Sequence, residues 1–177
     1  MLYPLYEYLI RRKLDAGLFP RELCFMTNEV DLLADPGRVE TVVRWCMEFP
    51  AIERIIFHIA SKDPSSLEEN LPSLIPLGTT ASVHLSMPSG DISFGTGIPE
   101  ILIVLGRSGR EEITDAIVAI AKEGVDPATI TEEMIESHLL YHVNPDFVIK
   151  TGGGSHLTDF LIWQSVYSEL FFTDINW

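Results

Sequence analysis

The feature that most constrains the fold is the stretch of residues 144–177, in which a turn, an apolar strand and a glycine cluster follow one another. Residues 144–146 predict the turn, residues 147–149 predict a short buried strand, and three glycines follow shortly after Lys150. An apolar run over residues 158–168 then predicts a helix. A strand that passes through a glycine turn into a helix exposes backbone N–H groups, which suit an anion. Because any such unit needs glycine in its turn, the pattern alone is a weak sign of an anion site.

Short apolar runs alternate with helical patterns along the whole chain. The expected strands are residues 23–26, 53–60, 81–85, 101–105, 147–149 and 170–172. This alternation predicts an α/β fold with a mostly parallel central sheet of about six strands, flanked by helices. The 177 residues show no internal repeat and no boundary, so we expect residues 1–177 to form one domain.

Three of the expected helices follow from apolar spacing and from residues that cap helix ends. Apolar residues at helical spacing predict helices over residues 1–16 and 39–48. Thr129 and Glu132 have the spacing of a capping box and predict a helix that ends near residue 140.

A second capping box precedes another helix. Ser108 and Glu111 have the required spacing, in which each side chain bonds the backbone of the other residue. Ile113, Ile117 and Ile120 then fall on one face of the helix, which we expect to pack on the core.

Charge and composition exclude several classes of function. The formal net charge of −14 disfavours nucleic acid and anionic membrane surfaces as partners. No apolar run reaches the roughly 20 residues that span a bilayer, and no signal peptide is evident, so we expect a cytoplasmic protein. Cys24 and Cys46 lie in apolar runs and are expected to be reduced core residues. His138 and His142 lack a third ligand nearby and predict no metal site.

Several short motifs match, in register, the C-terminal signature of a known family. They are Pro145-Asp146, Thr151-Gly152-Gly153, Phe160-Leu161, Trp163-Gln164, Tyr167-Ser168-Glu169-Leu170, Phe172-Thr173-Asp174 and Trp177. The chain thus resembles the cis-prenyltransferases, the undecaprenyl and dehydrodolichyl diphosphate synthase family. The likeness extends upstream to residues 101–113 and 130–139 and is weakest over residues 61–99. It implies the fold of that family and its reaction, the Mg²⁺-dependent condensation of isopentenyl diphosphate onto an allylic diphosphate.

The resemblance also implies which residues would form the site. It assigns Glu169 to the metal and the following residues to the diphosphate: Lys150, Gly152, Gly153, His156 and Thr158. Lys150 stands where the family has arginine, so it keeps the charge but not the forked geometry of a guanidinium.

The first strand departs from the family at the residues that matter most. Active members end this strand in the motif MDGNRRWA, whose aspartate binds the metal. An ungapped match from Pro20 places Asn28 at the aspartate, Glu29 at the glycine and Asp31 at an arginine. All three changes oppose the binding of a metal diphosphate, because two add negative charge and one removes a metal ligand.

The lost motif is similar to that of the Nogo-B-receptor type of subunit, a non-catalytic homologue that pairs with a catalytic cis-prenyltransferase. The resemblance therefore favours a degenerate subunit that does not bind Mg²⁺ alone, pairs with a catalytic homologue and reaches membranes only through that partner. A homodimer is a further possibility. The printed sequence lacks the C-terminal Arg-x-Gly of such subunits, which leaves open how a partner would be activated.

The family's dimer contact suggests an interface within the final segment. The residues assigned to it are Phe160, Trp163, Gln164, Tyr167, Glu169 and Phe171. The aromatic members follow helical spacing, and aromatic residues are enriched at interfaces. Two alternatives remain beside the subunit hypothesis: a divergent prenyltransferase that is active by itself, and an isoprenoid-binding or scaffold protein on the same fold.

Overall fold

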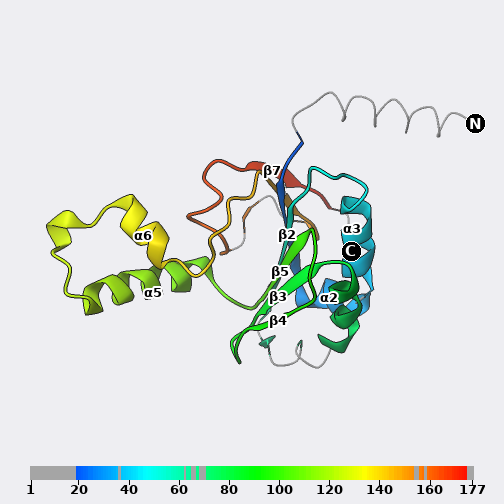
Figure 1. Ribbon diagram of the computed structural model, residues 1–177, viewed down its shortest axis with the longest axis horizontal. Coiled ribbons are helices and arrows are strands. Elements are labelled where there is room, and N and C mark those ends of the chain that lie inside the picture. The colour runs from blue at the N-terminus through cyan, green and yellow to red at the C-terminus, as the bar shows by residue number, and fades with distance from the viewer. Residues whose placement is uncertain are drawn as a thin grey trace, which may run out of the picture.

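The computed structural model describes residues 19–35, 37–61, 63–64, 67, 71–153, 156–157 and 159–174. One seven-stranded sheet runs through it in the order β4-β3-β5-β2-β1-β6-β7 (Figure 1). Every neighbouring pair is parallel except β3 and β4. The strands are β1 (Glu22–Asn28), β2 (Arg54–Ala60), β3 (Ser82–Ser86), β4 (Ile92–Phe94), β5 (Glu100–Leu105), β6 (Phe147–Lys150) and β7 (Glu169–Phe172).

Helices lie on both sides of this sheet (Figure 1). One side carries α2 (Glu29–Ala34), α3 (Arg38–Cys46) and the 3-10 segment η1 (Leu71–Thr79). The other side carries α5 (Gly109–Lys122), the short η2 (Pro127–Thr129) and α6 (Glu132–His138).

The two faces of the sheet have separate cores of unequal size. The larger core joins side chains of the central strands to α2, α3 and η1, and Leu74 and Leu77 of η1 are almost fully buried in it. The smaller core, on the face toward α5, is closed by Tyr141, Val143 and Phe160 from irregular segments. The α2–α3 side is thus covered by regular elements, whereas loops cover much of the α5–α6 side.

The expected α/β class and the mostly parallel sheet are confirmed, with seven strands instead of about six. The strand missed from the sequence is β4, a three-residue edge strand whose side chains are largely exposed, so it lacks an apolar run. The helix expected at residues 39–48 corresponds to α3, and the capping box of Ser108 and Glu111 is present at the start of α5. The helix expected over residues 1–16 lies outside the described residues.

Two predictions about α5 and α6 are wrong. The buried face of α5 contains Glu112, Ala116 and Ile120, while Ile117 is 53% exposed, because α5 packs on α6 and the following loop instead of on the sheet. The cap of α6 is Thr131, whose hydroxyl accepts a bond from the amide of Met134.

The helix expected over residues 158–168 is also wrong. The described part of this segment, residues 159–168, forms bends and turns, and Leu161 has a positive φ of 47°. Phe171 belongs to β7, so the apparent helical spacing of the aromatic residues spans a turn and a strand.

In the described part of the chain, no helix combines the length and hydropathy needed to cross a bilayer.

Candidate functional site

The candidate site lies at the carboxyl ends of β1 and β6. β1 continues to β2 on one side and β6 to β7 on the other, so the direction of the chain across the sheet reverses between them. Open α/β sheets bind ligands at such a reversal, outside the carboxyl ends of the strands. Met26 and Lys150 are paired in register there, and the amide of Thr151 donates to the carbonyl oxygen of Met26 at 3.2 Å.

At the end of β1, the three residues that replace the family motif bond within the chain. The Asn28 side chain caps α2, with Oδ1 accepting from the Asp31 amide at 3.0 Å and Nδ2 donating to Asp31 Oδ2 at 2.7 Å. Asp31 is buried, and Glu29 accepts a hydrogen bond from the hydroxyl of Ser61 beyond the end of β2. This end of the sheet therefore presents two carboxylates that already have partners.

The end of β6 provides the positive charge of the site. Lys150 Nζ donates to the carbonyl oxygen of Gly153 at 2.9 Å and holds the turn against the strand end. Gly152 and Gly153 have φ values of 79° and 76°, which favour glycine. His156 is exposed, and Thr158 lies outside the described residues.

Glu169 is not brought together with these residues. It begins β7 opposite Phe147, whereas Lys150 pairs with Phe172 at the other end of the same two strands. Three residues of strand separate the two positions by about 10 Å. The described residues also contain no group of three or more His, Cys, Asp or Glu side chains that could hold a metal ion. The two carboxylates at the end of β1 belong to Glu29 and Asp31, and both already accept hydrogen bonds.

The six residues assigned to the dimer interface divide into two groups. Phe160 and Gln164 are buried in this chain: the Phe160 ring stacks on His58 at 4.0 Å, and Gln164 Nε2 donates to Glu112 Oε1 at 3.1 Å. Trp163 is half-buried, and its Nε1 donates to Glu136 Oε1 on α6 at 3.2 Å. The side chains of Tyr167, Glu169 and Phe171 are exposed, although the Phe171 ring also stacks on Phe147 with the ring centroids 6.4 Å apart.

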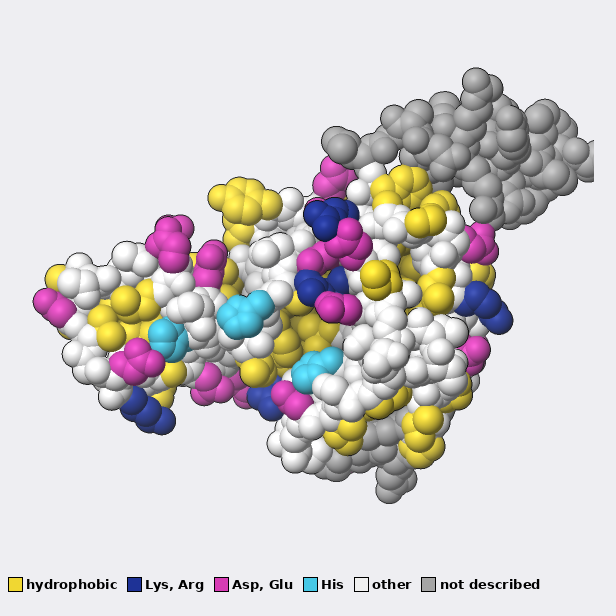
Figure 2. Space-filling view, viewed as in Figure 1, with side chains coloured by type: hydrophobic (Ala, Val, Ile, Leu, Met, Phe, Trp, Pro, Cys, Tyr) yellow, Lys and Arg dark blue, Asp and Glu magenta, His cyan; other side chains and the backbone are white. Residues whose placement is uncertain are grey.

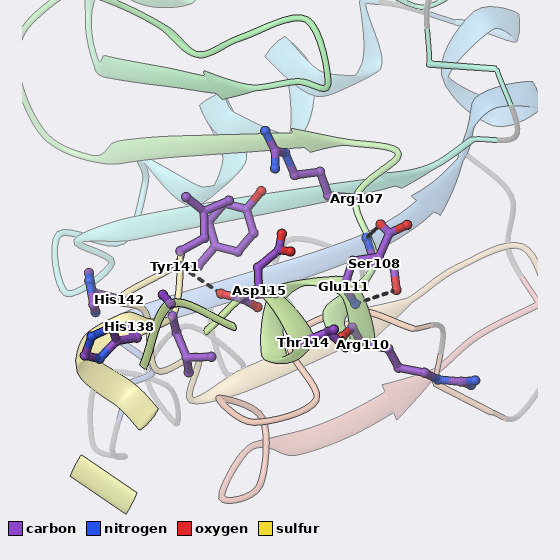
Figure 3. Close-up of a pocket in the computed structure, with 13 residues that line it drawn as sticks. Arg107, Ser108, Arg110, Glu111, Thr114, Asp115, His138, Tyr141 and His142 are labelled. Atoms are coloured by element: carbon purple, nitrogen blue, oxygen red, sulfur yellow. Dashed lines mark hydrogen bonds between the residues drawn. The ribbon is translucent and has the colours of Figure 1, made fainter. Parts of the chain in front are cut away.

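A larger cavity, of about 850 Å³, lies beside α5 and was not predicted from the sequence. Figure 3 shows Arg107 and Ser108 at one end, His138 and His142 at the other, and Tyr141 between them. Its wall includes Glu112, which accepts bonds from the Tyr141 amide and from Gln164. Burial raises the pKa of this carboxyl above its ordinary value, while these bonds oppose the shift. The only sign of this cavity in the sequence is Glu112, an acidic residue on an otherwise apolar face of α5.

His58 lies in a smaller cavity, at the carboxyl ends of β2 and β5, and is almost fully buried. Burial lowers the pKa of its imidazole to about 4, so the ring is neutral at pH 7. Its Nε2 lies 3.1 Å from the carbonyl oxygen of Arg107, an acceptor, so Nε2 carries the proton.

Comparison with known proteins shows which family has this sequence pattern and fold. A family model described as "Putative undecaprenyl diphosphate synthase" matches residues 96–177. The tritrans,polycis-undecaprenyl-diphosphate synthase (geranylgeranyl-diphosphate specific) of Thermoplasma volcanium is 41% identical over 179 aligned residues, which cover 80% of this chain and 68% of that protein. The chain belongs to the cis-prenyltransferase family.

Two further members of the cis-prenyltransferase family show how far the likeness extends. The synthase of the same name from Methanocaldococcus jannaschii is 45% identical over 83 residues, which cover 42% of this chain and only 30% of that protein. The crystal structure of a probable undecaprenyl diphosphate synthase from Campylobacter jejuni has a TM-score of 0.62 at 13% identity, covering 90% of this chain and 88% of that one. That last likeness supports the fold alone.

Proposed function

We propose that the chain is a non-catalytic subunit of a heteromeric cis-prenyltransferase, which makes a polyprenyl diphosphate from isopentenyl diphosphate and an allylic diphosphate. The observation that carries this proposal is the end of β1, where Asn28 bonds Asp31 and Glu29 bonds Ser61. A metal diphosphate would have to break these bonds and approach two carboxylates, at a cost in both desolvation and repulsion. In the proposed complex the catalytic homologue holds Mg²⁺ and both diphosphates.

The resemblance to the Nogo-B-receptor type of subunit supports the same proposal, because such subunits also lack the aspartate and glycine of the motif. The partner would contact the exposed side chains of Tyr167, Glu169 and Phe171 at the β7 edge of the sheet.

One observation favours a second candidate, a divergent prenyltransferase that is active alone. Lys150 and the glycine turn remain at the carboxyl end of β6, beside β1, and the relatives are named as synthases. In this alternative, Lys150 would hold a diphosphate with the help of His156 and Thr158.

The test is transfer of labelled isopentenyl diphosphate onto geranylgeranyl diphosphate with Mg²⁺, first by the purified chain alone. We expect no turnover from the chain alone, and a rise in the turnover of a co-expressed homologue that carries the intact DGN motif. Turnover by the isolated chain would refute the proposal and support the second candidate. Asn28→Asp serves as the matched variant: it should remain inactive alone, because Glu29 and Asp31 still oppose the diphosphate.

A further inference from the structure

The helices α5 and α6 and the residues between them form an arm, residues 109–138, that stands away from the sheet (Figure 1). The cavity of about 850 Å³ lies along α5 and is also lined by residues 139–142, which follow the arm. Its volume falls within the range of pockets that enclose a small organic ligand. None of its lining residues belongs to the candidate site at the ends of β1 and β6, so a ligand here is separate from the prenyl substrates.

The wall of the cavity is held in place by its own hydrogen bonds. Glu112 accepts from the Tyr141 amide at 2.8 Å and from the Gln164 side chain. The Tyr141 hydroxyl is bonded to the Ser86 hydroxyl at 2.9 Å. Burial raises the pKa of Tyr141 to about 12, while its bond to Ser86 and the charge of Arg107 oppose the shift. The cavity is therefore shaped before any ligand arrives.

Two charged side chains of the lining, Arg107 and Asp115, have no ionic partner among the described residues. Arg107 donates from Nη2 to the carbonyl oxygen of Met87 at 3.1 Å, and its buried Nε has no acceptor in the described part of the chain. Asp115 is exposed on α5. In the view of Figure 3, Arg107 lies above Tyr141 and Asp115 below it. The cavity thus offers one positive and one negative group to a ligand.

The surroundings of these two groups restrict the charge of the ligand. Residues 109–138 contain eight carboxylates and two basic side chains, so the formal net charge of the arm is −6 out of −14 for the whole chain. Figure 2 shows acidic side chains spread along the arm. This field attracts a cation toward Asp115 and disfavours a ligand that is only anionic. Arg107 lies outside the arm and disfavours a ligand that is only cationic.

Apolar side chains complete the lining. Leu139 and Leu140 belong to the segment that follows α6, and Ala119 lines the cavity from α5. Leu139 is buried, whereas Leu140 is 46% exposed. A ligand that covers Leu140 removes apolar surface from water, which favours binding. The complementary ligand is therefore a small zwitterion with an apolar part.

We propose that this cavity binds an apolar dipeptide with both termini free, its carboxylate on Arg107 and its ammonium on Asp115. A guanidinium binds a carboxylate through two parallel N–H groups, which suits the first contact. Asp115 lies almost two turns along α5 from Ser108, the neighbour of Arg107, which is roughly 10 Å. An extended dipeptide spans about 7 Å and, with the reach of both side chains, bridges this separation better than a single amino acid.

The experiment titrates the full chain calorimetrically with leucyl-leucine, for which we expect saturable binding. N-acetyl-leucyl-leucine lacks the ammonium and leucyl-leucinamide lacks the carboxylate, so each should bind about ten-fold or more weakly. Free leucine should also bind about ten-fold more weakly, because it cannot reach both charged groups. The absence of saturable binding by leucyl-leucine, or equal binding by either blocked peptide or by leucine, would overturn the inference.

Two variants assign the charged contacts. Asp115→Asn should weaken binding of leucyl-leucine about ten-fold but leave that of N-acetyl-leucyl-leucine unchanged, because the blocked peptide has no ammonium. Arg107→Gln should likewise weaken leucyl-leucine but not leucyl-leucinamide, and Arg107→Lys, which keeps the charge, should retain part of the affinity. A variant that only disturbs the fold would weaken all three peptides alike, and that result would contradict the assignment.

Glu132→Gln and Arg44→Gln are the matched controls. Glu132 is an exposed acid of the arm outside the cavity lining, and Arg44 is an exposed residue of α3 on the other side of the sheet. Both variants should bind leucyl-leucine like the wild type, and a loss as large as that of Asp115→Asn would refute a specific contact. The titrations need neither a homologous subunit nor a prenyl substrate, so the inference and the proposed function can fail separately.

Discussion

The two sides of the sheet differ in how they are covered. One side contributes most of the buried core, and the other leaves surfaces and cavities accessible to ligands or partners. On the α2–α3 side, helices and η1 bury a large continuous core. On the α5–α6 side, a smaller core is closed by loops, and the arm is attached by hydrogen bonds from Trp163 and Gln164. We therefore expect the first side to govern folding and the second to carry cavities and contacts. Four predictions test this comparison, from the largest expected effect to the smallest.

The largest effect is expected in the larger core. Phe57 is fully buried in β2 and stacks on Phe25, so Phe57→Ala should lower the free energy of unfolding by about 3–5 kcal/mol. Urea denaturation of the purified variant measures this loss. Val118→Ala on the arm is the control and should change stability by less than about 0.5 kcal/mol. Equal losses in the two variants would contradict the comparison.

Acid should destabilise the other face through His58. Its folded pKa of about 4 lies below the unfolded value of 6.5, so the unfolded state binds the proton first as the pH falls. The free energy of unfolding should therefore decrease as the pH falls from 6.5 to 4. At pH 4.5 it should be about 2–3 kcal/mol lower than at pH 7. The measurement is urea unfolding at pH 7 and 4.5 for the wild type and for His58→Leu, in which this contribution is absent. A pH dependence that is identical in both proteins would exclude His58 as its source.

The attachment of the arm should depend on Gln164. In Gln164→Leu, the buried carboxylate of Glu112 and the carbonyl oxygen of Tyr141 each lose a hydrogen-bond donor. This loss should lower the free energy of unfolding by about 1–3 kcal/mol. Because the folded pKa of Glu112 is raised, its ionised form disfavours folding, and this cost grows as the pH rises through that pKa. The difference between Gln164→Leu and wild type should thus be larger at pH 8 than at pH 5. A difference that shrinks as the pH rises would refute this role.

The smallest effect on folding is expected at Tyr167, which is 98% exposed. Tyr167→Ala should change the free energy of unfolding by less than about 0.5 kcal/mol. If β7 forms the catalytic pairing surface, the same change should weaken binding to the homologous subunit by about 2 kcal/mol. Titration calorimetry with that subunit measures the second effect. Unchanged affinity would move the pairing surface away from β7.

The sheet was largely predictable because its central strands are continuous apolar runs. Residues 55–59 and 101–105 are buried on both faces, and no helical pattern competes with them. β4 could not be found this way, since its three residues owe their strand conformation to pairing with β3 alone.

The prediction of a helix over residues 158–168 was wrong because the spacing of apolar residues in this segment was taken as evidence of a helix. Phe160 is apolar because it packs on His58 and Tyr141, and Gln164 is present because it bonds Glu112. Both partners are far away in the sequence, so spacing alone cannot distinguish such contacts from a helix face. The prediction that Ile117 packs on the core was wrong for a different reason. Its spacing did lie on a helix, but nothing in the sequence shows that this helix, α5, stands away from the sheet.

For the candidate site, the sequence identified the changed residues but not their partners. Asn28, Glu29 and Asp31 stand out by comparison with the motif, and their bonds to one another and to Ser61 emerge only in the fold. The separation of Glu169 from Lys150 likewise depends on strand register, which the motif does not encode.

The start of α5 has a consequence for the order in which the chain folds. Asp159 accepts bonds from the Ser108 hydroxyl at 2.8 Å and from the Arg110 amide at 3.1 Å, although it lies about fifty residues later. β1 depends on the same late part of the chain, because β6 is one of its two neighbours. During synthesis, one edge of β1 stays unpaired until β6 emerges. Unpaired strand edges can pair with other chains and so promote aggregation. The nascent chain is therefore most prone to aggregation just before residues 147–150, which form β6, leave the ribosome.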